Sequence, residues 1–308
     1  MLQCIGIYYL MFEYLQSIFR IGSVDEIMHQ TKLVALDLDG TLFNNESIIS
    51  QRNKTAIQKA TAAGIHVVIS TGRPFCGIPF SQIEGTDIRY ALTANGSAIY
   101  EISTGKCLYE ACLPNEVTFP ILDFLLSKEV HMDAFIEGKG YSPQKCLPTG
   151  LKLPIPPSIK EYVINTRTRV EDLKAYMQEH HLKMQKMTIN FIRDEKGELK
   201  HRKEVYEFLS SNPAISCVSG GYNNLEYTRA DVNKGTGLTQ LAKLLDIPVC
   251  ETMAIGDTEN DIAIIRAAGI GVAMGNATPA VKEIADCITL SNEEDGVACM
   301  LEKLLLPQ

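Results

Sequence analysis

"LVALDLDGTL", residues 33–42, joins an apolar run to two aspartates that are separated by a single leucine. A continuous apolar run is typical of a strand buried in a parallel sheet, and residues 32–36 fit one. Asp37 and Asp39 follow at its end, where two carboxylates repel each other and desolvation adds to the cost of their charge. A positive charge is therefore expected beside them.

The chain around this stretch alternates between strands and helices. Ser50 and Gly64 bracket an amphipathic helix as N-cap and C-terminal glycine, and further strands are expected at 66–70 and 90–95, with a hairpin across residues 104–105. The alternation resumes after residue 224, with strands at 252–257 and 270–274. Such a pattern predicts an α/β fold in which a Rossmann-like, doubly wound parallel sheet has helices on both faces.

Residues 113–223 break this regularity. Polar helices alternate there with strands, and a proline-rich crossing occupies residues 147–157. The change predicts an α/β domain, built over an antiparallel sheet, inserted into a core formed by residues 31–112 and 224–308.

Composition excludes several classes of protein. The net charge of −8 argues against general nucleic-acid binding, because no strong basic field attracts phosphate backbones. The nine cysteines form no C-x-x-C pair, which favours reduced thiols in a cytoplasmic protein. The apolar extension at residues 1–30 lacks a basic start and contains Glu13 and Gln16, so it fits neither a secretory signal nor a membrane span. We expect residues 1–27 to be an over-extended start or a loose amphipathic appendage, and we expect no membrane partner.

Polar side chains gather where the predicted strands end, which is where open α/β sheets bind their ligands. Four separate pieces of chain bring acids, a hydroxyl and an amine to one crevice. They are Asp37 and Asp39 after the first strand, Thr71 and Gly72 after the second, Lys234 before a later helix, and Asp257, Asn260 and Asp261 after the strand at 252–257.

The acids of this set suit a hard divalent cation. Asp37, the backbone of Asp39, and Asp257 offer oxygen ligands, and magnesium prefers a few carboxylates together with waters and a substrate phosphate. We therefore expect Mg²⁺ as the cofactor, with Asp37, Asp39 and Asp257 as its ligands. The ion would supply the positive charge that the paired aspartates require.

The remaining groups suit a phosphate. Thr71 can donate a hydrogen bond to a phosphate oxygen, and the backbone N–H groups of Leu38 and near Gly72 form a natural anion cradle. Lys234 adds a point charge. A carboxylate held beside such a phosphate can attack phosphorus directly and form an aspartyl-phosphate.

Asp39 lies two residues beyond Asp37, so both side chains point to the same side of an extended chain. From there Asp39 can protonate the leaving alkoxide and then activate the water that hydrolyses the acyl-phosphate. Arg73, Asn95 and Tyr141 are further candidates for substrate contacts, although a structural role is favoured for each of them.

Four motifs carry a resemblance to a known family: "DLDGT" (37–41), "STGR" (70–73), "NKG" (233–235) and "GDTEND" (256–261). In this order they resemble the haloacid dehalogenase superfamily, and most closely its Cof-type (YidA-like) sugar-phosphate phosphatases, from about Lys32 to the C-terminus. The resemblance implies a Rossmannoid core with a large inserted cap that closes over the site.

The same resemblance implies roles for the residues of each motif. Asp37 would be the nucleophile and Asp39 the general acid/base. Asp257 would complete the magnesium site, and Asp261 would support it without contacting the ion. The groups that would bind phosphate are Thr71, Gly72, Lys234 and Asn260.

We therefore expect a magnesium-dependent cytoplasmic phosphatase of small phosphorylated metabolites, in particular sugar phosphates. Two other functions use the same residues. A sugar phosphomutase would form the same aspartyl-phosphate and require a bisphosphate activator. A phosphate-sensing regulatory protein would keep the fold, and its biological effect would survive the change Asp37→Asn.

Overall fold

A computed structural model describes residues 28, 30–220 and 223–306 of the chain. The expectation for residues 1–27 lies outside the described residues. None of the helices in the described ranges is long and apolar enough to cross a lipid bilayer. In these ranges the cysteines at positions 76, 107, 112, 146, 217, 250 and 299 are free thiols.

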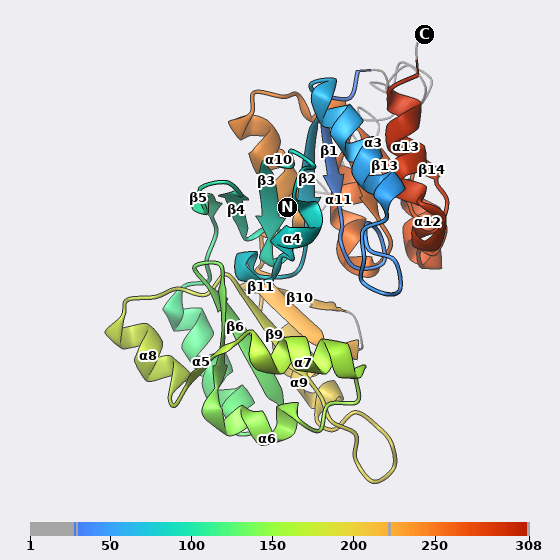
Figure 1. The fold of residues 1–308 in the computed structure, drawn as a ribbon. Coiled ribbons are helices and arrows are strands. Elements are labelled where there is room, and N and C mark those ends of the chain that lie inside the picture. The colour runs from blue at the N-terminus through green and yellow to red at the C-terminus, as the bar shows by residue number, and fades with distance from the viewer. Residues whose placement is uncertain (1–27, 29, 221–222, 307–308) are drawn as a thin grey trace, which may run out of the picture.

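The larger sheet of the described chain has eight strands (Figure 1). Its first six strands in spatial order are parallel, and the last two pair antiparallel, as expected for the hairpin. In spatial order the strands are β14 (Cys287–Ile288), β13 (Ile270–Ala273), β12 (Thr252–Gly256), β1 (Leu33–Leu36), β2 (His66–Ser70), β3 (Tyr90–Thr93), β4 (Ala98–Glu101) and β5 (Lys106–Glu110).

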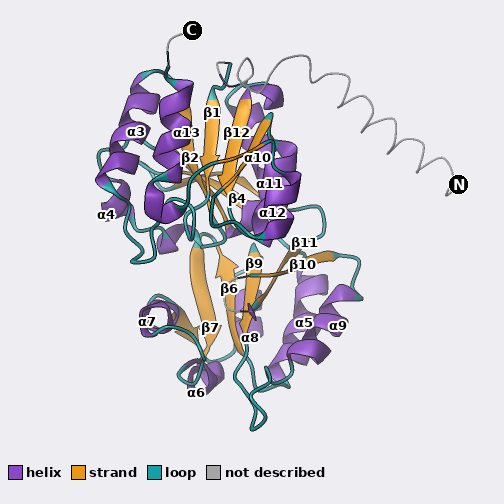
Figure 2. Ribbon diagram, turned by 90° about the vertical axis from the view of Figure 1, so that its right-hand side faces the viewer, coloured by secondary structure: helices purple, strands orange, loops and turns teal. Residues whose placement is uncertain are grey.

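Helices cover both faces of this sheet, as Figure 2 shows. On one face lie α3 (Gln51–Ala62), α4 (Phe80–Ile83) and α13 (Gly296–Leu304), and on the other α10 (Lys234–Leu244), α11 (Ile262–Ala267) and α12 (Pro279–Ile284). The predicted doubly wound α/β fold is therefore confirmed. Short 3₁₀ helices complete this part: η1 (Phe75–Gly77), η2 (Ala94–Gly96), η5 (Val249–Glu251), η6 (Glu259–Asp261) and η7 (Asn292–Glu294).

The second sheet of the described chain has six strands and is antiparallel except for one parallel pair, β7 with β8. In spatial order it contains β10 (Ile215–Ser219), β11 (Leu225–Arg229), β9 (Lys186–Asn190), β6 (His131–Ile136), β7 (Lys139–Pro143) and β8 (Thr168–Val170). Because β11 still belongs to this sheet, the chain returns to the eight-stranded sheet a few residues after the expected position at 224.

Helices flank this sheet as well. Apolar side chains of α5 (Asn115–Leu126), α8 (Leu173–Glu179) and α9 (Arg202–Ser210) share one core cluster with the sheet. In Figure 2, α6 (Leu147–Gly150) and α7 (Pro157–Asn165) lie on the side away from α5 and α9, and η3 (Gln144–Cys146) precedes α6. Each sheet thus has an apolar core of its own.

Candidate active site

The carboxyl ends of the parallel strands face the six-stranded sheet across a cavity of about 450 Å³. Asp37 follows β1, Thr71 follows β2 and Asp257 follows β12. These strands are neighbours, because β1 pairs with both β2 and β12. Residues from both sheets line the cavity, so the structure brings the predicted motifs together beneath the inserted segment.

Three buried carboxylates form the centre of the site. Oxygens of Asp37, Asp257 and Asp261 all lie within 4.8 Å of one another. Lys234 Nζ lies 2.6 Å from Asp37 Oδ1 and 2.6 Å from Asp261 Oδ1. Lys234 therefore supplies a positive charge to Asp37, the first of the two aspartates of the opening motif. With all of these groups ionised, the cluster still carries two net negative charges.

The pKa values of the cluster reflect this imbalance. Burial raises the pKa of Asp37 well above its usual range; Lys234 opposes the shift, and Asp261 and Asp257 add to it. Burial, and then Asp261, raise the pKa of Asp257 to about 7. Burial alone would lower the pKa of Lys234, but Asp261 and Asp37 together raise it. The carboxylates thus compete for too little positive charge.

Local sequence explains how Lys234 reaches the acids. Asn233 caps α10 by accepting a hydrogen bond from the N–H of Thr236, in a reciprocal capping box that fixes Lys234 as the first helical residue. A Cβ on Gly235 would lie 2.3 Å from the carbonyl oxygen of Ala263. Only glycine therefore allows α10 to pack this closely against α11, the helix that follows Asp261.

Asp257 and Asp261 are held by their own neighbours. Asp261 Oδ2 accepts the backbone N–H groups of Asp257 and Thr258, at 3.0 and 3.2 Å. Thr41 donates to Asp257 Oδ1 at 3.1 Å. Gly40 has φ +87°, and a Cβ there would lie 2.3 Å from Asp257 Oδ2, so the turn after Asp39 requires glycine. Sequence reasoning did not assign Thr41 a function, although it stands inside the "DLDGT" motif.

The carboxylate of Asp39 lies apart from this cluster. It forms a two-pronged ion pair with Arg73, at 2.9 Å from Nε and 2.6 Å from a terminal nitrogen. The guanidinium also lies 4.9 Å from the ring centre of Tyr162 on α7. Of the predicted metal ligands, Asp37 and Asp257 thus belong to the acidic cluster, and only the backbone of Asp39, as expected from the sequence, remains available. Arg73 lines the cavity as a partner of Asp39.

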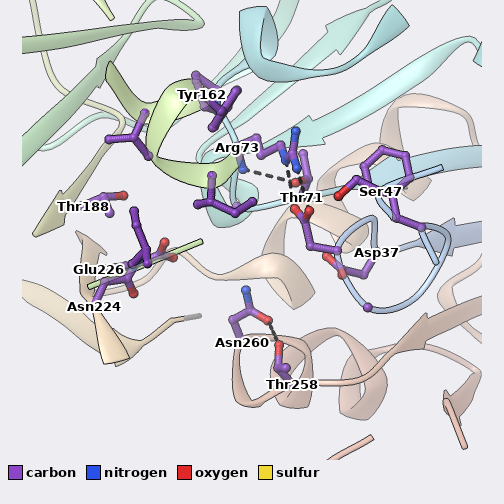
Figure 3. A pocket seen from close by; sticks show the side chains of 18 of the residues that line it. Asp37, Ser47, Thr71, Arg73, Tyr162, Thr188, Asn224, Glu226, Thr258 and Asn260 are labelled. Carbon is purple, nitrogen blue, oxygen red and sulfur yellow. Dashed lines mark hydrogen bonds and ion pairs between the residues drawn. The ribbon is translucent and has the colours of Figure 1, made fainter. Parts of the chain in front are cut away.

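The predicted phosphate ligands surround the acids. Thr71 and Gly72 line the cavity, and Asn260 faces them with its Oδ1 accepting a hydrogen bond from Thr258 (Figure 3). The Thr71 oxygen accepts the backbone N–H of Arg73 at 3.2 Å, and its hydroxyl hydrogen can still be donated. The side chain of Leu38 is buried in the apolar core, so only its backbone is available to a ligand.

The other two candidates for substrate contacts have structural partners. Asn95 is buried and donates to Glu226 Oε2 at 2.7 Å, which ties the two sheets together. Tyr141 packs into the apolar core of the six-stranded sheet, where its ring lies 5.5 Å from that of Tyr176. Neither belongs to the lining of the cavity as the structure describes it.

Sequence reasoning missed the functional groups that the six-stranded sheet adds. Charged side chains from its strands line the cavity opposite the acids: Asp133, Lys186 and Glu226, with Arg167 beside them. The available signal was a charged residue inside an apolar strand run, as in "MDAFI" at 132–136. No spacing rule links these strands, because they pair across distant parts of the chain.

The acidic cluster fits a divalent cation. Its donors are all oxygens, its net charge of minus two with all groups ionised would balance that of a divalent cation, and burial makes an uncompensated charge costly.

Comparison with known proteins identifies the family. Residues 34–301 match the model of the haloacid dehalogenase-like hydrolases. The phosphatase YwpJ of Bacillus subtilis is 33% identical over 293 residues, which cover 89% of this chain and all of that protein. The chain therefore belongs to the haloacid dehalogenase-like hydrolases, and it is a phosphatase of that superfamily.

Two further proteins bear on the substrate. The 5-amino-6-(5-phospho-D-ribitylamino)uracil phosphatase YwtE of Bacillus subtilis is 30% identical, and the match covers 90% of this chain and 99% of that protein. The solved structure of the sugar phosphatase BT4131 superposes with a TM-score of 0.71 at 26% identity, covering 88% of this chain and 98% of that one.

Proposed function

We propose that this family member is a magnesium-dependent phosphatase of small phosphorylated metabolites, in particular sugar phosphates, and that it acts through an aspartyl-phosphate in the cytoplasm. The observation that carries the proposal is the cluster of Asp37, Asp257 and Asp261 around Lys234, which carries two uncompensated negative charges when all its groups are ionised and reaches the cavity through Asp37. The reported relatives act on phosphorylated substrates by name, and one of them is named a sugar phosphatase.

In this mechanism Asp37 is the nucleophile. Lys234 holds its Oδ1, so the carboxylate is fixed in orientation and its Oδ2 is the oxygen left to attack phosphorus. The hydroxyl of Thr71 and the N–H groups of Gly72 and Leu38 would hold the phosphoryl oxygens. The amide of Asn260 would approach the phosphoryl group from the opposite side of the cavity.

Asp39 would move the protons. It would leave its ion pair with Arg73 to protonate the leaving alkoxide, and then deprotonate the water that cleaves the aspartyl-phosphate. Because Arg73 also lies against Tyr162 of α7, closure of the inserted segment would set the position of this acid. Residues 113–223, together with β11, would thus act as the cap that excludes bulk water.

Magnesium, when bound, would supply charge stabilisation to the phosphoryl oxygens as they become more negative. Asp37, Asp257 and the backbone carbonyl of Asp39 would hold the ion. Asp261 would support it by holding Lys234 and the N–H groups of the loop that carries Asp257.

Phosphate release from a panel of compounds tests the proposal. The panel contains sugar phosphates, nucleoside monophosphates and 5-amino-6-(5-phospho-D-ribitylamino)uracil, each with magnesium or with EDTA. We expect release that requires magnesium and is absent in Asp37→Asn. If wild type releases no phosphate from any compound, the proposal is wrong. Turnover only with an added sugar bisphosphate activator would instead identify the mutase alternative.

A further inference from the structure

The six-stranded sheet has two faces of opposite character. Met132 and Ala134 of β6 point into its apolar core, whereas Asp133 and Phe135 line the cavity. Strands β9 and β11 repeat this alternation, and they add Lys186, Thr188, Asn190 and Glu226 to the cavity side. A polar sheet face usually meets water, yet Asp133 is only 1% exposed. Residues of α7 and of the loops that follow the parallel strands line the same cavity opposite this face.

Strand register places three of these side chains in a row. Asp133 of β6 stands opposite Thr188 of β9, and Thr188 stands opposite Glu226 of β11. Adjacent strands lie about 4.8 Å apart, so the row is roughly 10 Å long. Figure 3 shows Thr188 and Glu226 across the cavity from Asp37. The row is thus long enough to bind several consecutive groups of one ligand.

Polar atoms of this row lack hydrogen-bond partners. Both carboxylate oxygens of Asp133 and the hydroxyl of Thr188 are buried without a hydrogen bond, although Asp133 Oδ2 lies 3.1 Å from Arg167 Nε as an ion pair. Asn224 Oδ1, which also lines the cavity, is unpaired as well. Buried polar groups are almost always hydrogen-bonded, and leaving one unpaired costs about 1–3 kcal/mol. A ligand that offers hydrogen bonds would remove this cost.

The charges beside the row cancel. Arg167 is the ion-pair partner of Asp133, and Lys186 Nζ lies 2.7 Å from Glu226 Oε2. Arg167 also lies 5.3 Å from the ring centre of Phe135. Two carboxylates and two cations leave this side of the cavity neutral, with both cations already paired. A second anionic group on a ligand would meet carboxylates without a free cation to receive it.

The row begins next to the predicted phosphate loop. A Cβ on Gly72 would lie 3.1 Å from Lys186 Nζ. A phosphate held at Gly72 therefore directs the group that carries it along the row from Glu226 towards Asp133.

We propose that Asp133, Thr188 and Glu226 select the leaving group, and that they take a neutral polyhydroxylated chain or ring with a single phosphate. This inference rests on the proposed phosphatase function. Hydroxyl groups of the ligand donate to the two carboxylates, and Thr188 exchanges a hydrogen bond with a hydroxyl between them. Arg167 and Lys186 are already paired with the two carboxylates, so neither of these cations is free to receive a second phosphate of the ligand.

Variants that each replace one functional group of the row test the assignment. Asp133→Asn removes one charge, and Thr188→Val removes one hydroxyl while keeping the shape of the side chain. We expect each variant to lower kcat/KM for polyol and hexose monophosphates at least about tenfold more than kcat/KM for p-nitrophenyl phosphate, which has no hydroxyl groups. Because its hydroxyl is unpaired, Thr188→Val should unfold at no lower urea concentration than wild type.

Asp123→Asn is the matched control. Asp123 is an exposed aspartate of α5 that pairs with Lys174, so the same chemical change occurs in the same part of the chain but outside the cavity. In this control, the ratio of kcat/KM for polyol and hexose monophosphates to kcat/KM for p-nitrophenyl phosphate should equal that of wild type. If the row variants also keep the wild-type ratio, the row has only a structural role. If wild type hydrolyses fructose 1,6-bisphosphate as well as fructose 6-phosphate, the cavity does not require a neutral leaving group.

Measurements of ligand binding test this inference independently of the proposed phosphatase activity. Calorimetry of Asp37→Asn with the same polyol and hexose monophosphates needs no turnover. In the Asp37→Asn background, a second substitution, Asp133→Asn or Thr188→Val, should weaken the binding of these monophosphates at least about tenfold. Unchanged affinity, or the failure of every monophosphate to bind, overturns the assignment even if wild type is an active phosphatase. Weakened binding without any turnover in wild type overturns only the proposed function.

Discussion

The molecule contains two buried clusters of charge that face each other across one cavity, and they differ in balance. Around Lys234, three carboxylates share a single cation and every acid is hydrogen-bonded to a neighbour. Around Asp133, each carboxylate has a cation of its own, yet oxygens remain without hydrogen bonds. The first cluster lacks positive charge, and the second lacks hydrogen-bond donors.

The ligands that we propose for the two clusters follow from this difference. A buried net charge is costly, so the acidic cluster needs a cation, and a cation beside Lys234 then attracts a phosphate. A neutral cluster with unpaired acceptors needs donors without charge, which hydroxyl groups supply. The two halves of a phosphorylated substrate thus match the two halves of the cavity.

The largest expected effect concerns the nucleophile. Asp37→Asn should reduce phosphate release by at least about 10⁴-fold, because an amide oxygen cannot replace the carboxylate in covalent catalysis. The variant should fold at least as stably as wild type at neutral pH, since burial and neighbouring acids already raise the pKa of Asp37. Kinetics and urea unfolding measure both effects. Substantial residual turnover would show that Asp37 is not the nucleophile.

Variants that each lack one cation allow the stability of the two clusters to be compared directly. Lys234→Met and Arg167→Met should each lower the free energy of unfolding by roughly 3–5 kcal/mol, because each leaves a buried carboxylate uncompensated. Relative to wild type measured at the same magnesium concentration, saturating magnesium should reduce the loss in Lys234→Met and leave the loss in Arg167→Met unchanged. Urea unfolding with magnesium or with EDTA measures this. If magnesium changed the free energy of unfolding of the two variants equally, the two clusters would not differ in net charge as described.

Magnesium should also stabilise the wild-type protein. At about 100 times its dissociation constant, a ligand of the native state adds about 2.7 kcal/mol to the free energy of unfolding. Asp257→Asn should largely abolish this gain, because it removes one of the carboxylates that attract the ion. Thermal unfolding over a magnesium titration measures the gain, with Asp123→Asn as the control that retains it.

The smallest expected effect is a pH dependence in the six-stranded sheet. Burial lowers the pKa of His131, and Arg169 and Arg167 lower it further against the opposing effect of Asp133. The unfolded chain therefore takes up a proton below about pH 6.5 that the folded chain does not. The contribution of His131 to the free energy of unfolding should fall as the pH drops through this range, by at most about 1.4 kcal/mol per pH unit, whereas the raised pKa of Asp257 contributes in the opposite direction.

His131→Gln tests the assignment of this pH dependence. The difference in free energy of unfolding between His131→Gln and wild type should shift in favour of the variant as the pH falls from 7 to 5, whereas His180→Gln, at an exposed histidine, should show no such shift. If His131→Gln keeps the wild-type slope, another group causes the dependence.

Much of the acidic cluster could be predicted from local pattern. Asp37, Thr71 and Asp257 follow apolar runs, and parallel strands bring such ends to one edge of a sheet, so their meeting follows from the order of elements. Lys234 was predictable from its place at the start of a helix in the same layer. The pairing of Asp39 with Arg73 was not predictable, because a side chain two residues along can turn to several partners.

The row on the six-stranded sheet could not be predicted in the same way. Asp133, Thr188 and Glu226 lie far apart in the chain and meet only through the register of three strands. A slip of one residue in any strand would turn its polar side chain into the apolar core. Sequence alone also placed the return to the larger sheet at 224, before β11, because β11 shows no change of pattern.

The sequence by itself thus determined which residues are candidates for phosphoryl chemistry and at which edge of a parallel sheet they lie, because strand ends and helix starts are local features. Only the tertiary structure decided the charge balance of the two clusters and the partner of each carboxylate. Both depend on burial and on strand register, since desolvation makes an unpaired charge or acceptor costly only after the two sheets enclose it.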